Sequence, residues 1–485
     1  MQMHSFILSL LVSSAVILGA QAHPRNSSAF VRRQTAGKLV FAHFMVHIIF
    51  PSNIPAETNA PNEIGVVSDR TSAAAYDSDM QRAKSIGIDA FALNIGVDSY
   101  TDQQLGYAYQ SAANNGMKVF ISFDFNWWNT GEGSAVGAKI AQYAGRPAQL
   151  FVDGKVFASS FAGDGLDVAA VRAAVGRAVY FAPNYHPDQG DFSSIDAALN
   201  WMGWSNNGNN KAPSGGVTVS VTSGDQAYRS ALGSKGYVAP ASPWFSTHFG
   251  PEVSYSKNWV FPSDLLWYLR WREILSLQPN FVEIVTWNDY GESHYVGPLS
   301  SPHTDDGSSR WVNDMPHDGW LEMAKPFIQA YKAGSTNVNQ YITNTTMQPA
   351  NNPSGNYFEG RPNGYQTMTD DVFVVTLLRA AGTVVVNSGG TAYTYSAPAG
   401  ASAFAVPFHL ATDTEHLPLR VNFNAYVGTV PPGPRDVLQS DGLSNFARGL
   451  KVACAATPSL PATPPAATPA TTTIAATVAP TAPPI

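Results

Sequence analysis

Residues 88–125 read IDAFALNIGVDSYTDQQLGYAYQSAANNGMKVFISFDF and contain one strand–helix–strand unit. Ile88–Ile95 and Met117–Phe125 are short, nearly continuous apolar runs, which are typical of strands buried on both faces. Gln103–Asn114 lies between them and has a helical pattern. Two buried strands joined through a helix predict a parallel strand pair, because a parallel connection has to cross the sheet.

The same alternation extends through residues 38–335. Lys38–Val46 (KLVFAHFMV) is strand-like, and further strand-like runs follow: AQLFVDGKVFAS, VYFAPNY, GVTVSVTS and FVEIVTW, at 148–159, 179–185, 216–223 and 281–287. About eight such units in about 300 residues favour a (β/α)8 TIM barrel over a doubly wound sheet. Neither GxGxxG nor GxxxxGK[ST] occurs, so nothing points to a nucleotide.

The pattern changes after Gly334. Short strands separated by turn residues, such as Asp371–Leu377 and Ala403–Phe408, predict a small antiparallel β-sandwich domain over 345–450. Residues 455–485 are rich in Ala, Thr and Pro and carry no charge, so we expect a disordered tail.

The N-terminus predicts the compartment. Residues 1–22 have an apolar core and a small-residue cleavage site, which is typical of a secretory signal peptide. Residues 23–37 end near Arg32-Arg33 and are either a propeptide or a basic leader. The protein is therefore expected to be secreted, extracellular or in a cell wall, with Asn344 as a glycosylation acceptor and no disulfide from the single Cys454.

Composition limits the partners. The 485-residue chain has a net charge of −7, only 13% charged residues and 12% aromatic residues. Such a chain is not expected to bind nucleic acid or a membrane, and we expect a monomer. Low charge with many aromatic residues favours a neutral ligand such as a sugar.

Ile284–Pro298 reads IVTWNDYGESHYVGP and places Asp289 and Glu292 just beyond a predicted strand. On a barrel, catalytic groups lie where strands end. Other strand ends carry amides, acids and rings as well. The substrate-binding residues predicted in this way are His43, Asn94, Asp124, Trp127, Asn184, Trp244, His248, Trp287, Asn288, Tyr290, His294 and Tyr295.

Two carboxylates in a ring-lined cleft fit hydrolysis of a glycosidic bond, where one donates a proton and the other activates water or attacks carbon. Two alternatives stay open from the residues alone. A metal hydrolase would use the His and Asp residues between His294 and Asp318, although no HExxH spacing is present. A sugar-binding barrel without activity would use the same loops only for recognition.

Several stretches also resemble one family. AHFMV, GIDAFALNIG, SFDF, SPWFSTHFG with KNW, WNDYGESHYVGP and MPHDGW are similar to glycoside hydrolase family 71, the fungal endo-1,3-α-glucanases or mutanases. The similarity runs from about Lys38 to about Ala425.

The resemblance implies a (β/α)8 barrel followed by a β-sandwich, secretion, and inverting hydrolysis of α-1,3-glucan without a metal or cofactor. It implies that Asp289 and Glu292 are the catalytic residues. Which of them is the acid is left open by the sequence; we expect Glu292 to be the acid and Asp289 the base. A wall-binding protein without activity and a glycosidase acting on another glycan are the alternatives.

One segment departs from the family. HFMV is followed by His47–Tyr76, which resembles nothing in the family, has no clear periodicity and contains several loop-forming residues. We interpret it as a long loop, either an insertion or sequence that a faulty gene model retained. Because it follows the first strand, it is expected on the active-site face.

Overall fold

The structure is a computed structural model that describes part of the chain. The described residues are 37–46, 70–206, 219–249, 257–299, 317, 319–342, 345–347, 349–350, 363–369, 371–388, 391–407, 420–427, 435–438 and 446–447. The predicted signal peptide, Arg32-Arg33, Asn344 and the Ala/Thr/Pro-rich tail lie outside these residues.

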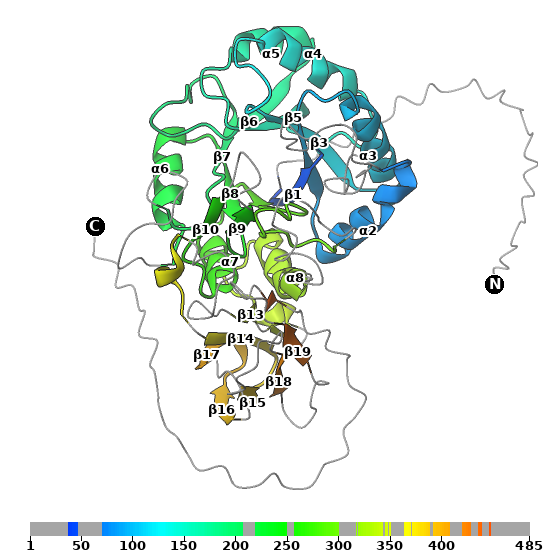
Figure 1. Cartoon of the computed structure of the whole chain (residues 1–485). Helices are drawn as coiled ribbons and strands as arrows, with labels where there is room; N and C mark the ends of the chain where they lie inside the picture. Colours follow the sequence, from blue (N-terminus) through cyan, green and yellow to red (C-terminus); the bar gives the residue numbers. More distant parts are fainter. Residues whose placement is uncertain are drawn as a thin grey trace, which may run out of the picture. The chain divides into compact units, whose positions relative to one another are not determined.

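A parallel sheet forms the centre of the described chain (Figure 1). Its strands are β1 (Leu39–Met45), β2 (Ala90–Ile95), β3 (Lys118–Asp124), β5 (Lys155–Phe161), β6 (Val179–Pro183), β7 (Ala197–Leu199), β8 (Gly236–Ala241) and β11 (Phe281–Ile284). They pair in the order β6-β5-β3-β2-β1-β11-β8-β7, and each pairing is parallel. A short strand, β4 (Phe151–Val152), pairs antiparallel with β5.

The sheet curls, so that its two outer strands approach each other. The backbone N–H of Asp196, next to β7, donates to the carbonyl of Phe181 in β6 at 3.0 Å. The Asp196 carboxylate also accepts from the Phe181 N–H at 3.1 Å. A curled, parallel-rich sheet confirms the mixed α/β class predicted from the alternating strands and helices.

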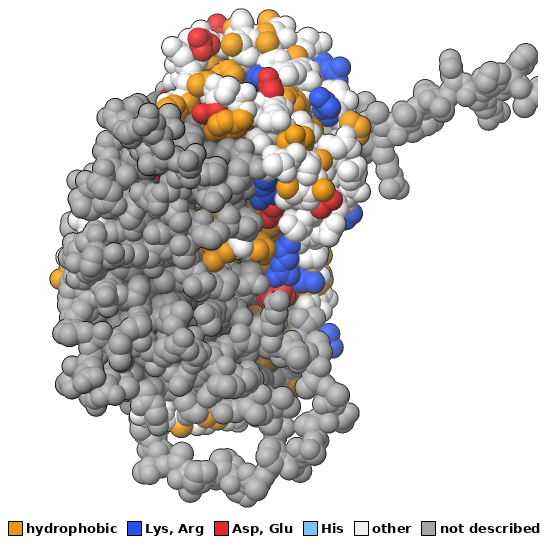
Figure 2. Space-filling model, turned by 45° about the vertical axis from the view of Figure 1, so that its right-hand side comes forward, with side chains coloured by type: hydrophobic (Ala, Val, Ile, Leu, Met, Phe, Trp, Pro, Cys, Tyr) orange, Lys and Arg blue, Asp and Glu red, His pale blue; other side chains and the backbone are white. Residues whose placement is uncertain are grey.

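Helices connect most of these strands. They are α2 (Asp77–Ile86), α3 (Thr101–Asn115), α4 (Gly133–Tyr143), α5 (Val168–Val175), α6 (Thr222–Leu232), α7 (Leu266–Leu277) and α8 (Gly319–Lys332). Among the described residues, none of the helices has the length and apolar character needed to cross a membrane. On the face in Figure 2, basic and acidic side chains lie interspersed over the described surface.

Side-chain alternation explains how the sheet is buried on both faces. Val40, Ala42 and Phe44 of β1 belong to the core shared with the helices. Leu39 and Phe41 face the opposite way, into a second cluster built from strand residues such as Phe120. The inner face of the curled sheet is therefore packed with side chains, as the barrel prediction requires.

Two expectations need correction. GVTVSVTS was expected to be a strand, but 219–221 are irregular and Thr222 begins α6. The strand at this position of the sheet is β7, only three residues long. The segment 47–76 was expected to be a loop, yet Ala73–Tyr76 is a 3₁₀ helix, η1, whose Tyr76 is fully buried. Residues 47–69 lie outside the described residues.

The C-terminal region contains antiparallel strands, as expected. One sheet has β12 (Thr345–Met347), β13 (Pro349–Ala350), β14 (Asp371–Leu378), β17 (Gly400–Pro407) and β20 (Phe446–Ala447); the other has β15 (Gly382–Ser388), β16 (Thr391–Ala397), β18 (Arg420–Val427) and β19 (Arg435–Leu438). Of two short 3₁₀ turns, η3 (Asn339–Tyr341) precedes β12, and η4 (Tyr365–Thr367) lies between β13 and β14. Their packing as a β-sandwich stays a prediction.

Candidate active site

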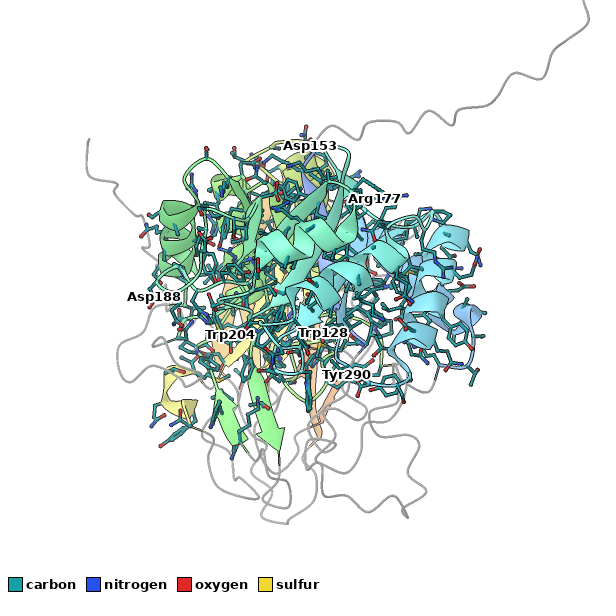
Figure 3. All side chains as sticks on the ribbon, turned by 90° about the horizontal axis from the view of Figure 1, so that it is seen from above. Trp128, Asp153, Arg177, Asp188, Trp204 and Tyr290 are labelled. Carbon is teal, nitrogen blue, oxygen red and sulfur yellow. The ribbon has the colours of Figure 1, made fainter. Side chains whose placement is uncertain are left out.

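Residues that precede the strands and residues that follow them lie on opposite sides of the sheet. Trp128, Asp188, Trp204 and Tyr290 follow strands β3, β6, β7 and β11, and Figure 3 shows them toward one side of the sheet. Asp153 and Arg177 precede β5 and β6 and lie toward the other side (Figure 3). Residues after the strands therefore share the face on which parallel α/β folds carry their sites.

The loop after β11 carries both predicted catalytic carboxylates. Its two ends are held together because Thr286 N–H donates to the His294 carbonyl at 3.1 Å and Val296 N–H donates to the Thr286 carbonyl at 3.1 Å. Gly297 N–H donates to the Trp287 carbonyl at 2.8 Å. A Cβ at Gly297 would lie 2.7 Å from the indole of Trp287, so only glycine permits this close approach.

The same loop is attached to strand β1. Trp287 N–H donates to the His43 carbonyl at 2.7 Å. The amide of Asn288 accepts from Met45 N–H at 2.8 Å and donates to the Met45 carbonyl at 3.2 Å. Asn288 therefore continues the β1–β11 pairing with its side chain, and Asp289 is fixed immediately after it.

A β-hairpin closes the other side of the loop. It consists of β9 (Ser246–Phe249) and β10 (Lys257–Val260), which pair antiparallel. Thr247 Oγ1 donates to the Gly291 carbonyl at 2.9 Å. Lys257 Nζ forms an ion pair with Glu292 Oε1. The hairpin thus supplies a positive charge directly to one of the two carboxylates.

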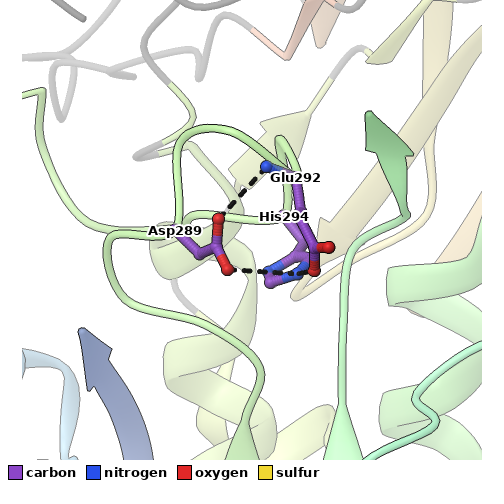
Figure 4. A group of neighbouring side chains, drawn as sticks. All are labelled: Asp289, Glu292 and His294. Atoms are coloured by element: carbon purple, nitrogen blue, oxygen red, sulfur yellow. Dashed lines mark hydrogen bonds and ion pairs between the residues drawn. The ribbon is translucent and has the colours of Figure 1, made fainter. Parts of the chain in front are cut away.

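Asp289, Glu292 and His294 form a compact group (Figure 4). Glu292 N–H donates to Asp289 Oδ1 at 3.1 Å. His294 Nε2 lies 3.1 Å from Glu292 Oε2 and 3.9 Å from Asp289 Oδ2. The imidazole is fully buried, while the Asp289 and Glu292 side chains are 17% and 22% exposed. Both carboxylates are recessed and still open to a ligand.

The pKa values of the two carboxylates are shifted in opposite directions. Burial, followed by the neighbouring negative charge of Glu292, raises the pKa of Asp289. Burial also opposes ionisation of Glu292, but the charge of Lys257 and the hydrogen bond from His294 outweigh it and lower the pKa of Glu292 to about 2. Asp289 is therefore the group that is easier to protonate.

A hydrogen-bond chain orients the imidazole. Asp289 N–H donates to Thr286 Oγ1 at 2.9 Å, so the Thr286 hydroxyl is left to donate to His294 Nδ1, which lies 3.1 Å away. In the neutral ring, Nε2 then carries the proton and donates to Glu292. Trp204 stacks on the imidazole with centroids 5.7 Å apart, and Phe245 packs beside it at 5.6 Å.

The spacing of the carboxylates is short. At least one oxygen of each carboxylate and a ring nitrogen of His294 lie within 4.8 Å of one another. Inverting glycosidases hold their carboxyl groups roughly 6.5–9.5 Å apart, and retaining ones about 5–5.5 Å. In this structure, the pair is closer than an attacking water between them requires.

This trio also offers three possible metal ligands. Two carboxylates and an imidazole are a donor set that a divalent cation accepts. However, the ammonium of Lys257 lies against Glu292, and a second positive charge at the same carboxylate would be repelled. The local charge favours proton chemistry over metal binding at these residues.

Most of the predicted substrate-binding rings lie inside the protein. Trp244, Trp287, Tyr290 and Tyr295 are at most 4% exposed, and His294 is fully buried. Tyr295 stacks on His317 with centroids 3.8 Å apart, and Tyr290 OH donates to the Pro298 carbonyl at 3.0 Å. These rings support the loop after β11 in this structure and offer no open face to a sugar, so the sugar contacts expected of them stay predictions.

The remaining predicted residues differ in exposure. Trp127, after β3, is 40% exposed and can offer a ring to a sugar. Asp124 ends β3, and its Oδ1 accepts from Asn126 N–H at 2.9 Å. Asn184 is buried and donates to the Leu199 carbonyl at 3.0 Å and to Tyr228 OH at 2.9 Å, which ties β6 to its neighbours. His43 and Asn94 are buried on β1 and β2; His248 lies in β9, and its side chain is outside the described part.

Sequence reasoning missed three supporting residues. Lys257 was visible only as part of the KNW stretch, and Thr286 only as part of the strand end. Asp79, on α2, accepts from Trp287 Nε1 at 2.8 Å across 208 positions. An acidic residue in the first turn of a helix is ordinary in sequence, so no local signal distinguishes Asp79.

Comparisons with known proteins agree on one family. The family model described as "Glycosyl hydrolase family 71" matches residues 36–420. "Mutanase Pc12g07500" of Penicillium rubens is 38% identical, covering 88% of this chain and 96% of the relative. "Glucan endo-1,3-alpha-glucosidase agn1" of Schizosaccharomyces pombe is 32% identical, covering 86% and 95%.

A solved structure, the GH99 endo-alpha-mannosidase from Bacteroides thetaiotaomicron, is similar with a TM-score of 0.43 and 11% identity, over 61% of this chain and 98% of that chain. The family assignment depends on the sequence matches, which span most of this chain and nearly all of both relatives. The chain belongs to glycosyl hydrolase family 71 and is a glycoside hydrolase.

Proposed function

We propose that the protein is a secreted endo-acting hydrolase of α-1,3-glucan that works by an inverting acid/base mechanism. We also propose that its parallel sheet closes as a (β/α)8 barrel, followed by a β-sandwich. The observation that carries the activity is the Asp289–Glu292 pair, whose pKa values are shifted in opposite directions. The names of the relatives, a mutanase and a glucan endo-1,3-alpha-glucosidase, support α-1,3-glucan as the substrate.

The pKa directions favour Asp289 as the acid and Glu292 as the base, the reverse of the assignment expected from the sequence. A general acid must hold a proton before the reaction, and burial beside a second carboxylate favours that state for Asp289. A general base must be ionised, and Lys257 and His294 favour that state for Glu292.

In the proposed reaction, Asp289 gives its proton to the glycosidic oxygen as the bond to the anomeric carbon breaks. Glu292 accepts a proton from the water that attacks the same carbon from the opposite face. The products are two shorter glucans, and the acid and base exchange protons with solvent to restore the starting state. This geometry needs room for a water, so we expect the pair to separate when substrate binds.

The test follows the first anomer released from α-1,3-glucan by NMR. Inversion predicts that the β-anomer appears first, because the α-linkage is inverted at the anomeric carbon. Initial release of the α-anomer would contradict inversion, and the short carboxylate spacing would then indicate a retaining mechanism. A chelator in the same assay is expected to leave the rate unchanged, since no step uses a metal.

A panel of polymers tests the substrate. We expect reducing sugar from α-1,3-glucan, but not from β-glucan or α-1,4-glucan. Release from one of the other polymers alone would assign a different glycan. Binding to insoluble α-1,3-glucan without release would indicate a wall-binding protein. An extracellular or cell-wall location is part of the proposal, and one relative is named an ascus wall endo-1,3-alpha-glucanase.

A further inference from the structure

The inner face of the curled sheet changes from apolar to polar toward the ends of the strands. Phe41 packs against Phe120, Phe157 and Phe281 with centroids 5.0, 5.3 and 5.5 Å apart. Because side chains alternate along a strand, the next inward positions are two residues further on. They are His43, Ser122, Ser159 and Glu283, together with Asn94, which lies two residues after the inward Ala92.

Three polar atoms in this layer lack a partner. His43 Nε2, Asn94 Oδ1 and Ser122 Oγ have no hydrogen bond to any described residue. All three side chains are at most 1% exposed. They lie on three consecutive strands, β1, β2 and β3, and Asn94 is directly opposite Ser122 in the ladder. We call His43, Asn94 and Ser122 the β1–β3 polar layer.

Such atoms are unusual, since nearly all buried polar groups in folded proteins are hydrogen-bonded, and an unpaired one lowers stability. Ser159 shows the ordinary arrangement at the equivalent position of β5. Its Oγ donates to the Ala182 carbonyl at 2.7 Å, and the side chain is equally buried. Three unpaired atoms on neighbouring strands indicate a site that is completed by a ligand.

The chemistry of the layer selects the ligand. His43 Nδ1 lies 2.8 Å from Glu283 Oε1, and a carboxylate only accepts, so Nδ1 carries a proton. In the neutral ring, Nε2 is then an acceptor. Asn94 Oδ1 is an acceptor as well, and the Ser122 hydroxyl both donates and accepts. Two acceptors and a hydroxyl fit the O–H groups of a sugar, whereas an anion would be repelled by the acceptors and by Glu283.

The layer is connected to the catalytic loop. The carbonyl of His43 accepts from Trp287 N–H at 2.7 Å, and Met45, two residues later, pairs with Asn288. Trp201 packs against the layer at His43, which its ring meets edge-on with centroids 4.7 Å apart, and it also packs against Phe161 at 4.8 Å. Trp201 itself is only partly buried, so we infer that a turn of its indole opens the layer at His43.

We propose that the β1–β3 polar layer receives hydroxyl groups of the glucosyl unit bound at Asp289 and Glu292, and that Ser122 is a specificity-determining residue. The proposal depends on the proposed function in two ways: it needs a glucan as ligand, and it needs that glucan to bind at Asp289 and Glu292. The proposal predicts that the unpaired hydroxyl of Ser122 strengthens glucan binding and lowers the stability of the free protein.

The test compares Ser122→Ala with Ser159→Ala in the full chain carrying Asp289→Asn, which prevents turnover. Thermal unfolding gives stability, and calorimetry with a tetramer of α-1,3-linked glucose gives the Kd. Ser122→Ala should leave the melting temperature unchanged or higher and weaken binding about 5- to 10-fold, the effect of one hydrogen bond. Ser159→Ala should lower the melting temperature and leave the Kd unchanged, because its hydroxyl is already paired.

An unchanged Kd in Ser122→Ala, with a higher melting temperature, would overturn the proposal. It would show that the hydroxyl lowers stability and does not contribute to glucan binding. Asn94→Ala provides a second variant, for which weaker binding supports the layer and unchanged binding contradicts it. If only tetramers of another glucose linkage bind, the substrate proposed above is wrong, yet loss of that binding in Ser122→Ala still supports the layer. If no glucan tetramer binds, both proposals fail.

Discussion

The indole N–H of Trp287 donates to Asp79 Oδ1 at 2.8 Å, joining the loop after β11 to helix α2. The other oxygen of Asp79 pairs with Arg70 at 2.7 Å, and the side chains of Arg70 and Asp79 are only 7% and 5% exposed. Arg70 is the first described residue after 47–69. The carboxylate of Asp79 therefore links Arg70, which directly follows residues 47–69, to Trp287 in the loop after β11.

Trp287→Phe is expected to lower kcat roughly 10-fold with little change in KM, because the ring stays apolar while the loop loses its anchor to Asp79. Asp79→Asn should lower stability by about 3 kcal/mol, since it breaks the buried ion pair between Arg70 and this carboxylate. The loss of stability in the double variant should be smaller than the sum of the losses in the two single variants.

Asp77→Asn is the matched control for this pair. Asp77 also lies in the first turn of α2, but it accepts from Ser111 and Asn115 and makes no contact with Trp287 in the described structure. Its substitution should leave kcat unchanged. Equal losses of kcat in Asp77→Asn and Trp287→Phe would show that α2 matters only for general stability.

The two carboxylates proposed to be catalytic, Asp289 and Glu292, should affect stability in opposite directions. Folding raises the pKa of Asp289, so its contribution is fully present below the unfolded value of 3.8 and is lost as pH rises. Asp289→Asn should therefore be more stable than the parent at pH 7 and similar to it below pH 3.8. Denaturant unfolding at both pH values measures the difference.

Glu292→Gln should do the reverse. The lowered pKa of Glu292 gives stability that is present above 4.5 and lost as pH falls toward about 2. Removing the charge leaves Lys257 and His294 without their carboxylate, and we expect a loss of about 1–3 kcal/mol at pH 7. Both variants should lose at least about 100-fold in kcat. Stability changes of the same sign would contradict the assignment of acid and base.

Lys257→Met tests the electrostatic part of the site by itself. Without the ammonium, the pKa of Glu292 should rise, because its largest ionising influence is removed. The acid limb of the kcat/KM profile should then move to higher pH, while activity near the basic limb changes less. Lys257→Arg keeps the charge and is expected to restore the limb toward its original position. A profile that does not move in Lys257→Met would mean that Glu292 is not the base.

Most strands, and the position of the two carboxylates after one of them, could be predicted because their signals are local. Apolar runs such as Phe281–Ile284 identify buried strands, and Asp289 and Glu292 follow one directly. β7 could not be found, since three residues give no periodicity and its place is set by the pairing of Asp196 with Phe181. The competing run at 216–223 has stronger strand propensity but continues into α6.

The roles within the site depended on long-range contacts. Sequence placed the rings Trp287 and Tyr295 beside the acids, but only the fold reveals that they face the interior. The assignment of acid and base could not be read from spacing, because it depends on Lys257, 35 positions away. The pKa values of Asp289 and Glu292 depend on how the loop after β11 packs against the β9–β10 hairpin. This packing cannot be predicted from composition.

His317 gives the protein a built-in sensitivity to acid. It is fully buried, stacks on Tyr295 and donates from Nδ1 to the Tyr295 carbonyl at 3.0 Å. Burial, which outweighs this hydrogen bond, lowers the pKa of His317 to about 3 from 6.5. The unfolded chain therefore binds one more proton than the folded protein between these pH values, and stability falls as pH drops through that window.

His317→Phe keeps the stacked ring and removes the titration. It should be about 1 kcal/mol less stable than the parent at pH 7, because the hydrogen bond to Tyr295 is lost. At pH 4 it should be the more stable of the two, since the parent has by then lost most of the stability linked to a neutral His317. Unfolding curves of both proteins from pH 7 to 4 should therefore cross. Parallel curves would show that another group accounts for the loss of stability in acid.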